Sequence, residues 1–247
     1  MARLDLDAYT RSLLGGPLDF MKTVAVITMV LESANFVLFD NRYGLPWYID
    51  RVTFPIFCFA SAVHIARGFE FRGQVASLLM LGAIAQPFHA AAFAGFGGAN
   101  VLVTLGIGAA LAGMLAPRPA WQSDAVLALV IALNIVLPAW MSAGWEYGML
   151  GAVLPLAFAT GLRHGGPRLI WPAAVLTVMY LMNDFAKPEA MRVPGLDIAF
   201  ALGGTALIIL AAQAMRGRPR FLHRYALHVV YPGHLAVLVG LKALSGG

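Results

Sequence analysis

The chain has 247 residues, of which 60% are hydrophobic and only 12% are charged. Soluble globular domains carry roughly 25% charged residues, so this composition and its mean hydropathy of +0.77 exclude an ordinary soluble domain. The sequence therefore predicts an all-α, polytopic integral membrane helical bundle. Its single cysteine, Cys58, builds neither a disulfide framework nor a zinc site, and no metal is expected.

The elements follow from apolar runs along the chain. Residues 1–20 are predicted to form an interfacial segment, with a short helix over 4–14 that lies on the membrane surface rather than a cleaved signal peptide. The apolar runs after it are joined by short connections, so residues 1–247 are expected to form a single membrane-embedded domain. About nine transmembrane helices are predicted, at 21–40, 52–67, 74–95, 100–116, 124–140, 147–163, 169–186, 195–215 and 225–244.

The positions of the basic residues predict the orientation. A cytoplasmic N-terminus places most of the 17 Lys and Arg residues on the cytoplasmic side, as the positive-inside rule requires. The net charge of +5 then reflects topology. We expect the basic cluster at 216–224 to contact anionic membrane lipid rather than nucleic acid.

Glu32 is the first candidate for function, because it lies inside an apolar run long enough to cross a bilayer. A carboxylate at such depth costs about 2.5 to 3.5 kcal/mol. Thr28, Glu32 and Asn35 are spaced by four and three residues, which places them on one helix face. This spacing predicts a polar interior seam in which Glu32 is catalytic and Asn35 binds substrate. The alternative is that Glu32 only hydrogen-bonds to a neighbouring helix.

The last predicted span carries Tyr231 and His234, three residues apart and therefore close together on its surface. His234 and Glu32 each lie ten residues after a basic residue at the start of a span, and both spans run in the same predicted direction. We therefore expect Glu32 and His234 to lie at similar depth and to face one cavity, with Tyr231 and Asn35 in its lining. The alternative for His234 is a packing role.

Further polar residues collect near the predicted ends of the spans. Toward the outer side they predict a polar vestibule that binds substrate, although each taken alone is explained as a solvated loop group. At the cytoplasmic side they are candidates for binding an anionic cosubstrate, and interfacial snorkelling is the alternative. The outer group is His89, Asn100, Glu146 and Asp184, and the cytoplasmic group is His64, Arg67 and Arg72.

Six sequence blocks follow one another across nearly the whole chain: LDFMKTVAVITMVLESAN, DRVTFPIFCFA, AIAQPF, GANVLVTLGIG, WEYGMLG and YPGHLAVL. Together they resemble the TraX family of conjugative pilin acetylases, including its TrbP-like members. The resemblance implies a multi-pass acyltransferase of the bacterial inner membrane. It also implies acetylation of the N-terminal amine of a pilin subunit, with acetyl-CoA as the cosubstrate and other conjugative transfer proteins as possible partners.

One departure from the family concerns the first span, where Glu32-Ser33 stands in place of the usual Asp-His. Acyl transfer to an amine needs a base for the ammonium proton and a donor for the tetrahedral oxyanion. If the absent histidine is that base in the family, Glu32 or His234 must replace it here. Ser33 is a candidate nucleophile, although Glu32 beside it points about 100° away around the helix.

Other functions stay open at this point. The first is a non-catalytic pilin chaperone or assembly factor that kept the fold after losing the histidine. The second is another pilin maturation reaction, such as cyclisation through Ser33. A proton-coupled transporter is disfavoured, because the sequence has no convincing internal repeat.

Overall fold

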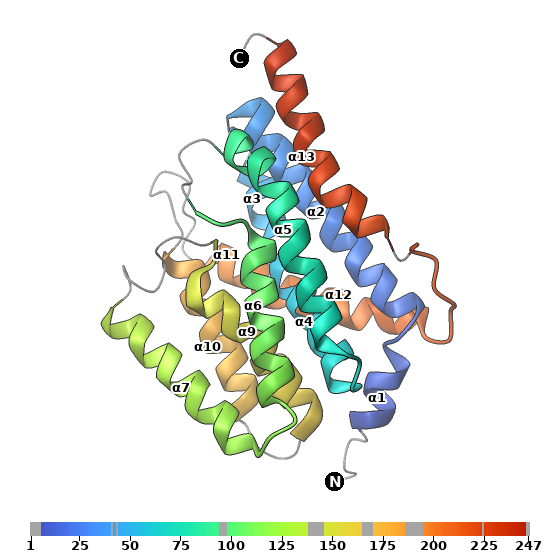
Figure 1. Cartoon of the computed structure of the whole chain (residues 1–247), viewed down its shortest axis with the longest axis vertical. Coiled ribbons are helices and arrows are strands. Elements are labelled where there is room, and N and C mark those ends of the chain that lie inside the picture. The colour runs from blue at the N-terminus through green and yellow to red at the C-terminus, as the bar shows by residue number, and fades with distance from the viewer. Residues whose placement is uncertain are drawn as a thin grey trace.

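The computed structural model describes residues 6–40, 42, 44–93, 98–137, 146–164, 170–185, 195–223 and 225–245. Within these ranges the chain is almost entirely helical, which confirms the predicted all-α class. Figure 1 shows the helices gathered into one bundle, with α1 (Leu6–Ser12) and the end of α13 (Ala226–Leu244) at opposite ends of its long axis.

The predicted apolar segments all coincide with helices. The predicted 195–215 span is a continuous helical stretch that includes a π-helical turn at Phe200–Gly204. The predicted 4–14 helix corresponds to α1, whereas the short helix α3 was not predicted. The remaining helices are α2 (Gly16–Phe39), α3 (Gly44–Asp50), α4 (Thr53–Ala66), α5 (Phe71–Ala92), α6 (Val101–Leu115), α7 (Ala120–Val136), α9 (Gly148–His164), α10 (Ile170–Phe185), α11 (Leu196–Ala199) and α12 (Thr205–Ala212).

Not every helix is long enough to cross a membrane alone, because a spanning helix needs about 20 apolar residues. Across the described part of the chain, five helical segments meet this requirement by length and composition. The helices α6 and α7 are apolar but have only 15 and 17 residues. Nine crossings and a cytoplasmic N-terminus therefore stay predictions. The five segments are Gly16–Phe39, Gly44–Ala66, Phe71–Ala92, Leu196–Met215 and Ala226–Leu244.

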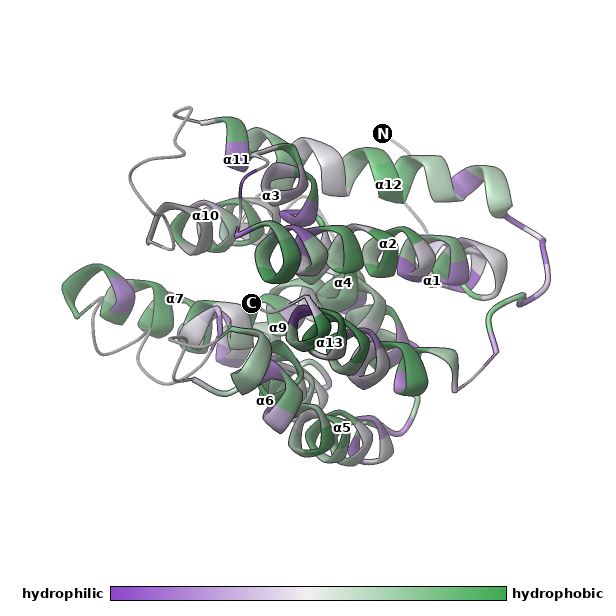
Figure 2. Ribbon diagram, turned by 90° about the horizontal axis from the view of Figure 1, so that it is seen from above, coloured by the Kyte–Doolittle hydropathy of each residue, from purple (hydrophilic) through white to green (hydrophobic). Residues whose placement is uncertain are grey.

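Helix α4 occupies the centre of the bundle. Most of its side chains are buried, and it packs against α2, α6 and α9. In Figure 2, α5 and α6 lie on one side of α4, and α3, α11 and α12 lie on the other. A helix that is apolar on all sides belongs in such an interior position. Cys58 is buried in this core.

Small residues allow α6 and α9 to approach closely. A Cβ added at Gly108 would lie 2.7 Å from the carbonyl oxygen of Ala152 and from the ring of Pro155. Close approach through small residues is the usual way in which membrane helices pack. This contact fixes the start of α9, where the ring of Tyr147 stacks on that of Phe54 with the ring centroids 4.3 Å apart.

A buried hydrogen bond fixes the rotation of α2 relative to α4. The hydroxyl oxygens of Thr28 and Thr53 lie 2.6 Å apart, and the Thr53 hydroxyl also donates to the Ala25 carbonyl at 3.2 Å. Thr28 precedes Glu32 by one helical turn, so the same contact sets the direction in which Glu32 leaves the helix.

Candidate active site

A cavity of about 300 Å³ lies among α2, α3, α4, α5, α6 and α13. Apolar side chains make up about half of its lining, and polar side chains from several helices converge on the rest, as in small-molecule sites. Glu32 and His234 both line this cavity, and their matched depth in the first and last spans predicts this juxtaposition. The polar lining residues are Glu32, Ser33, Asp50, Thr53, Gln74, Ser77, His89, Glu146, Tyr147, His228, Tyr231 and His234.

Glu32 belongs to a buried charged cluster. It interacts electrostatically with Asp50, Arg51 and Glu146, so three carboxyl groups meet one guanidinium in the described part of this region. The Arg51 Nη2 atom lies 3.7 Å from Asp50 Oδ2, and these two side chains are only 7% and 9% exposed. Charges buried to this extent need partners, so each member depends on the others.

Arg51 is held in a fixed position at the junction of α3 and α4. Its Nε donates to the Trp47 carbonyl at 3.1 Å, and its guanidinium lies 4.1 Å from the centroid of the Trp47 ring. On the other side of the pair, Asp50 Oδ1 is buried and has no hydrogen-bond partner among the described residues. This oxygen is therefore available to a ligand in the cavity.

The two ring nitrogens of His234 differ in their surroundings. Its Nδ1 lies 3.0 Å from the Val230 carbonyl oxygen, which can only accept a hydrogen bond, so Nδ1 carries a proton. In the neutral ring the lone pair then resides on Nε2. Nε2 is buried, and none of the described residues hydrogen-bonds to it. His234 is thus arranged as a base.

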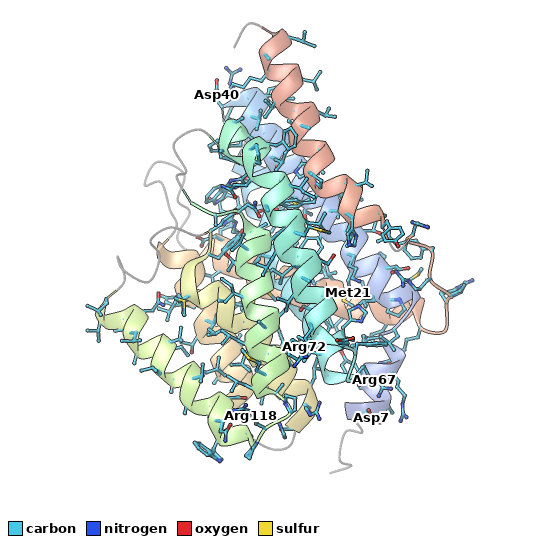
Figure 3. All side chains as sticks on the ribbon, in the orientation of Figure 1. Asp7, Met21, Asp40, Arg67, Arg72 and Arg118 are labelled. Atoms are coloured by element: carbon cyan, nitrogen blue, oxygen red, sulfur yellow. The ribbon has the colours of Figure 1, made fainter. Side chains whose placement is uncertain are left out.

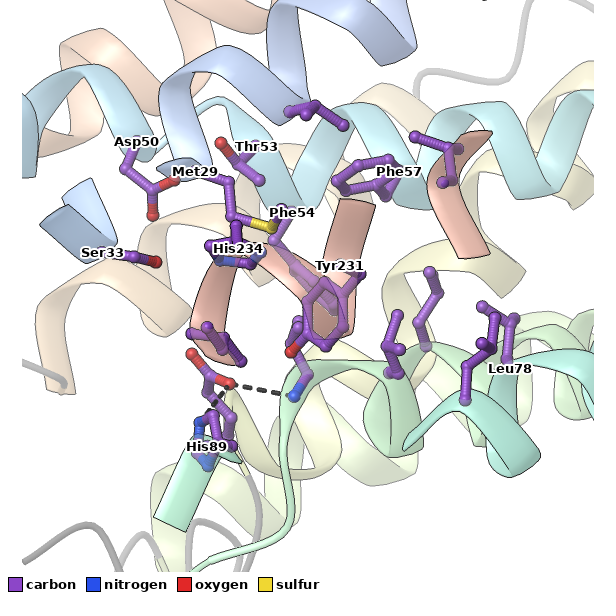
Figure 4. Close-up of a pocket in the computed structure, with 18 of the residues that line it drawn as sticks. Met29, Ser33, Asp50, Thr53, Phe54, Phe57, Leu78, His89, Tyr231 and His234 are labelled. Atoms are coloured by element: carbon purple, nitrogen blue, oxygen red, sulfur yellow. Dashed lines mark hydrogen bonds and ion pairs between the residues drawn. The ribbon is translucent and has the colours of Figure 1, made fainter. Parts of the chain in front are cut away.

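Glu146 and His89 form a second polar contact in the lining. Glu146 Oε2 accepts a hydrogen bond from the Val101 amide at 2.9 Å and lies 3.5 Å from His89 Nε2, as the dashed lines in Figure 4 show. The Val101 amide begins α6, where the helix dipole favours a negative group. His89 and Glu146 therefore lie in the cavity, as the predicted vestibule requires.

Asn100 joins α5 to the start of α6. It is 0% exposed, lies outside the cavity lining, and caps the N-terminus of α6. Its Oδ1 accepts from the Leu102 amide at 3.1 Å, while Nδ2 donates to the Gly82 carbonyl at 2.8 Å and to Gln86 Oε1 at 2.9 Å. Its predicted role in substrate binding stays a prediction.

The two other predicted substrate-binding residues are Asn35 and Asp184. Asn35 is buried on α2, one turn after Glu32, but does not line the cavity. Of the predicted polar face of this helix, Glu32 therefore lines the cavity and Asn35 does not. The side chain of Asp184 lies outside the described residues.

The predicted cosubstrate residues gather at one end of the bundle, outside the cavity lining. Arg67 Nη1 donates to Asp7 Oδ1 at 2.6 Å, which ties α1 to the end of α4. Arg72 is exposed at the start of α5, and His64 Nε2 lies 3.5 Å from Lys22 Nζ. Figure 3 shows Asp7, Arg67 and Arg72 close to this end of the molecule.

Several lining or cluster residues were missed at the sequence level, among them Asp50, Arg51, Ser77 and His228. Asp50 and Arg51 carried a usable signal, because two charges stand directly before an apolar helix in the block DRVTFPIFCFA. Ser77 on α5 and His228 on α13 carried none. Their Oγ and Nε2 atoms lie 2.8 Å apart, although 151 residues separate them in the chain.

The sequence is similar to known proteins along almost its full length. The TraX protein family matches residues 17–242. Protein TraX of Escherichia coli is 30% identical over 234 residues, which cover 93% of this chain and 88% of that protein. Protein TraX of E. coli strain K12 is 29% identical over 246 residues, covering 96% and 93%. A probable fimbrial assembly protein FimC, serogroup H1, of Dichelobacter nodosus is 27% identical over 240 residues, covering 90% and 94%. No solved structure gives a significant match.

Proposed function

This chain belongs to the TraX family, and from that premise we propose that it acetylates the N-terminal amine of a pilin subunit, with acetyl-CoA as the donor. The observation that carries the proposal is the meeting of a carboxyl cluster and of His234 Nε2, which has no hydrogen-bond partner in the described part of the chain, in one cavity. We place the protein in the bacterial inner membrane with nine crossings and a cytoplasmic N-terminus, where it meets the pilin before assembly.

Recognition of the amine is assigned to the charged cluster. An N-terminal amine arrives as a cationic ammonium group, and three carboxyl groups beside one guanidinium among the described residues offer it oxygen acceptors. Asp50 Oδ1, which is buried without a partner in this part of the chain, supplies an acceptor. Glu32 shares the same lining and is the second acceptor.

Activation of the amine is assigned to His234. The ammonium group must lose a proton before its nitrogen can attack the acetyl carbonyl, and Nε2 of His234 is the base that accepts it. As the C–N bond forms, negative charge develops on the carbonyl oxygen. The Tyr231 hydroxyl, in the same lining, is the proposed donor to this oxygen. His234 in this way replaces the histidine that the family usually carries after the first-span carboxylate.

The donor is proposed to bind at the end of the bundle that carries His64, Arg67 and Arg72. Acetyl-CoA is anionic through its phosphates, and exposed arginines are suited to contact them. Arg72 is exposed at the first turn of α5, a helix that also lines the cavity. The apolar part of the cavity suits the acetyl group and its thioester.

A second candidate function has one supporting observation. Ser33 is buried and lines the cavity beside Glu32. A maturation reaction through this hydroxyl, such as cyclisation of the pilin, therefore has a nucleophile in a suitable place. It predicts that Ser33→Ala is inactive, whereas acetylation through His234 predicts that Ser33→Ala retains activity.

The deciding experiment is intact-mass measurement of the cognate pilin produced with and without this protein. Acetylation predicts an increase by the mass of one acetyl group, located at the N-terminal residue by fragmentation. An unchanged mass would overturn the proposal. An unchanged pilin that nevertheless co-purifies with the protein would instead support a non-catalytic assembly role.

A further inference from the structure

A serine and a histidine meet in the cavity at a place that the proposed amine site does not use. Ser77 lies on the second turn of α5 and His228 on the first turn of α13. Their Oγ and Nε2 atoms are 2.8 Å apart, and both residues line the cavity. A hydroxyl within hydrogen-bond reach of an imidazole is the arrangement that activates a serine nucleophile.

The protonation of His228 is compatible with this use. His228 Nδ1 is buried and has no hydrogen-bond partner among the described residues. In the tautomer with the proton on Nδ1, the lone pair on Nε2 accepts the hydrogen bond of the Ser77 hydroxyl. The same Nε2 can then take the hydroxyl proton, while Nδ1–H is free to meet a ligand or a water molecule.

The Ser77–His228 pair and the amine site occupy different ends of the cavity. His228 precedes His234 by six residues, which corresponds to about 9 Å along a helix axis. Ser77 precedes His89 by twelve residues, or about 18 Å. Figure 4 shows the same separation, with Ser33, Asp50 and His89 toward one end and Leu78, the neighbour of Ser77, toward the other.

The pair lies nearer to the proposed donor end. Arg72 precedes Ser77 by five residues on α5, about 7.5 Å along the axis. A thioester held near Arg72 therefore reaches Ser77 before it reaches the carboxyl cluster. We propose that Ser77, activated by His228, is a covalent carrier that takes the acetyl group from acetyl-CoA and passes it to the amine. The inference rests on the proposed acetyltransferase function.

The two steps balance as an ordinary acyl exchange. Ser77 Oγ attacks the thioester carbonyl, the C–O bond forms, and the hydroxyl proton passes to His228 Nε2. The C–S bond breaks, and the CoA thiolate leaves with that proton. In the second step the amine, made neutral by His234 at the charged end, moves along the cavity to the serine ester and attacks it, so that the C–N bond forms and the C–O bond breaks. The proton lost by the amine nitrogen returns to Ser77 Oγ through His228.

The surroundings of Ser77 suit an ester that must survive until the amine arrives. Phe57, Leu78 and Leu81 line the cavity beside it, and such apolar walls limit access of water to the carrier. Gln74, one turn before Ser77, also lines the cavity and is oriented by donating from Nε2 to Ser61 Oγ at 2.8 Å. The Gln74 amide is therefore an oriented, uncharged polar group at this end of the cavity.

The decisive test is exchange of labelled CoA into acetyl-CoA by the purified full-length protein, in the absence of pilin. A carrier that forms an acetyl-serine regenerates acetyl-CoA from labelled CoA without any acceptor, whereas direct transfer to the amine does not. We expect exchange by the wild-type protein, and a fall of at least about 100-fold in Ser77→Ala. Peptide mass spectrometry is expected to locate an acetyl group on Ser77.

Ser123→Ala is the matched control. Ser123 is a buried serine on α7 and does not line the cavity. The Ser123→Ala variant is expected to keep the exchange reaction. If Ser77→Ala does not fold, Ser77→Cys decides, because its thiol accepts acetyl as a thioester that hydroxylamine cleaves. A folded Ser77→Cys protein without such an adduct would overturn the carrier.

The outcomes separate the carrier from the proposed function. Acetylated pilin without exchange, or exchange that persists in Ser77→Ala, would overturn the carrier and leave the acetyltransferase intact. If the wild-type protein neither acetylates pilin nor exchanges CoA, both the carrier and the acetyltransferase function are overturned. Exchange that disappears in Ser77→Ala, together with acetylated pilin in the wild type, supports both.

Discussion

The two ends of the cavity differ in the kind of side chain that each presents. The end around Glu32 combines carboxyl groups, Arg51 and two histidines, whereas the Ser77–His228 end is lined by hydroxyl, amide and imidazole groups. An ammonium ion requires compensating charge when it leaves water, and a thioester does not. One cavity can therefore suit both an ammonium ion and a thioester, provided that the charged groups are confined to one end.

The two ends are joined by the same two helices. α5 carries Ser77 and His89, and α13 carries His228 and His234. Each helix has a proline between its two positions, Pro87 just before His89 on α5 and Pro232 on α13. Proline kinks a membrane helix because it removes a backbone hydrogen bond. On both α5 and α13, residues on either side of the proline line the one cavity.

The largest effect on pilin acetylation is expected when the first-span carboxyl group is removed. Glu32→Ala is expected to lower pilin acetylation by about 10²- to 10⁴-fold, because the amine loses an acceptor at the charged end. Glu32→Asp is expected to keep part of the activity. CoA exchange, which depends on the other end, is expected to persist in both variants, as measured with labelled CoA.

Glu70→Ala is the control for Glu32→Ala, since Glu70 is an exposed carboxylate outside the cavity. It should acetylate pilin at the wild-type rate. Wild-type acetylation by correctly inserted Glu32→Ala would show that Glu32 only stabilises the helix packing.

Replacement of Arg51 tests whether its positive charge stabilises the buried carboxyl groups around it. Arg51→Ala is expected to destabilise the protein by about 3 to 5 kcal/mol, because Asp50 and its carboxyl neighbours are left buried without their cation. Thermal unfolding of detergent-purified protein measures this change. Arg42→Ala removes an exposed arginine from the same region of the chain and should have no such effect. Equal melting temperatures for the two variants would contradict the assignment.

The meeting of Glu32 and His234 in one cavity could be predicted from the sequence, whereas the direction in which each side chain leaves its helix could be predicted only in part. The nine apolar runs all correspond to helical segments, because hydropathy fixes which residues leave water. Equal distances from the span boundaries placed Glu32 and His234 at one level. The orientation of Asn35 depends on how α2 packs on α4, which the Thr28–Thr53 contact decides.

Neutral residues escaped prediction for a different physical reason. A carboxylate in an apolar run is costly and therefore conspicuous, but serine and histidine are tolerated in membrane helices as ordinary packing residues. Only the contact between α5 and α13 distinguishes Ser77 and His228. Asn100 was predicted to bind substrate from its place at the outer end of a span, and its capping contact with the Leu102 amide could not be read from that position. The helix α3 was missed because seven residues carry too weak a pattern.

A smaller effect is expected at the base. His234→Asn keeps an amide donor near the Nδ1 position, which can still bind the Val230 carbonyl, and removes Nε2. Pilin acetylation is expected to fall by about 100-fold, the low end of general-base contributions, with exchange unchanged. His223→Asn, at an exposed histidine before α13, is the control. A parallel loss of exchange in His234→Asn would show that the two ends do not act separately.

The smallest effect is expected at the entrance, where Arg72 and Arg67 differ in what they already contact. Arg67 is paired with Asp7 at 2.6 Å, whereas Arg72 is exposed on the first turn of α5. Arg72→Ala is therefore expected to raise the KM for acetyl-CoA by about 2- to 5-fold, the size of one exposed charge pair, with kcat unchanged. Initial rates of CoA exchange at varied acetyl-CoA measure both constants. Arg67→Ala should alter KM less, because its guanidinium is engaged by α1, and its main effect should be loosening of α1. A larger KM change in Arg67→Ala than in Arg72→Ala would move the donor entrance from the start of α5 to the end of α4.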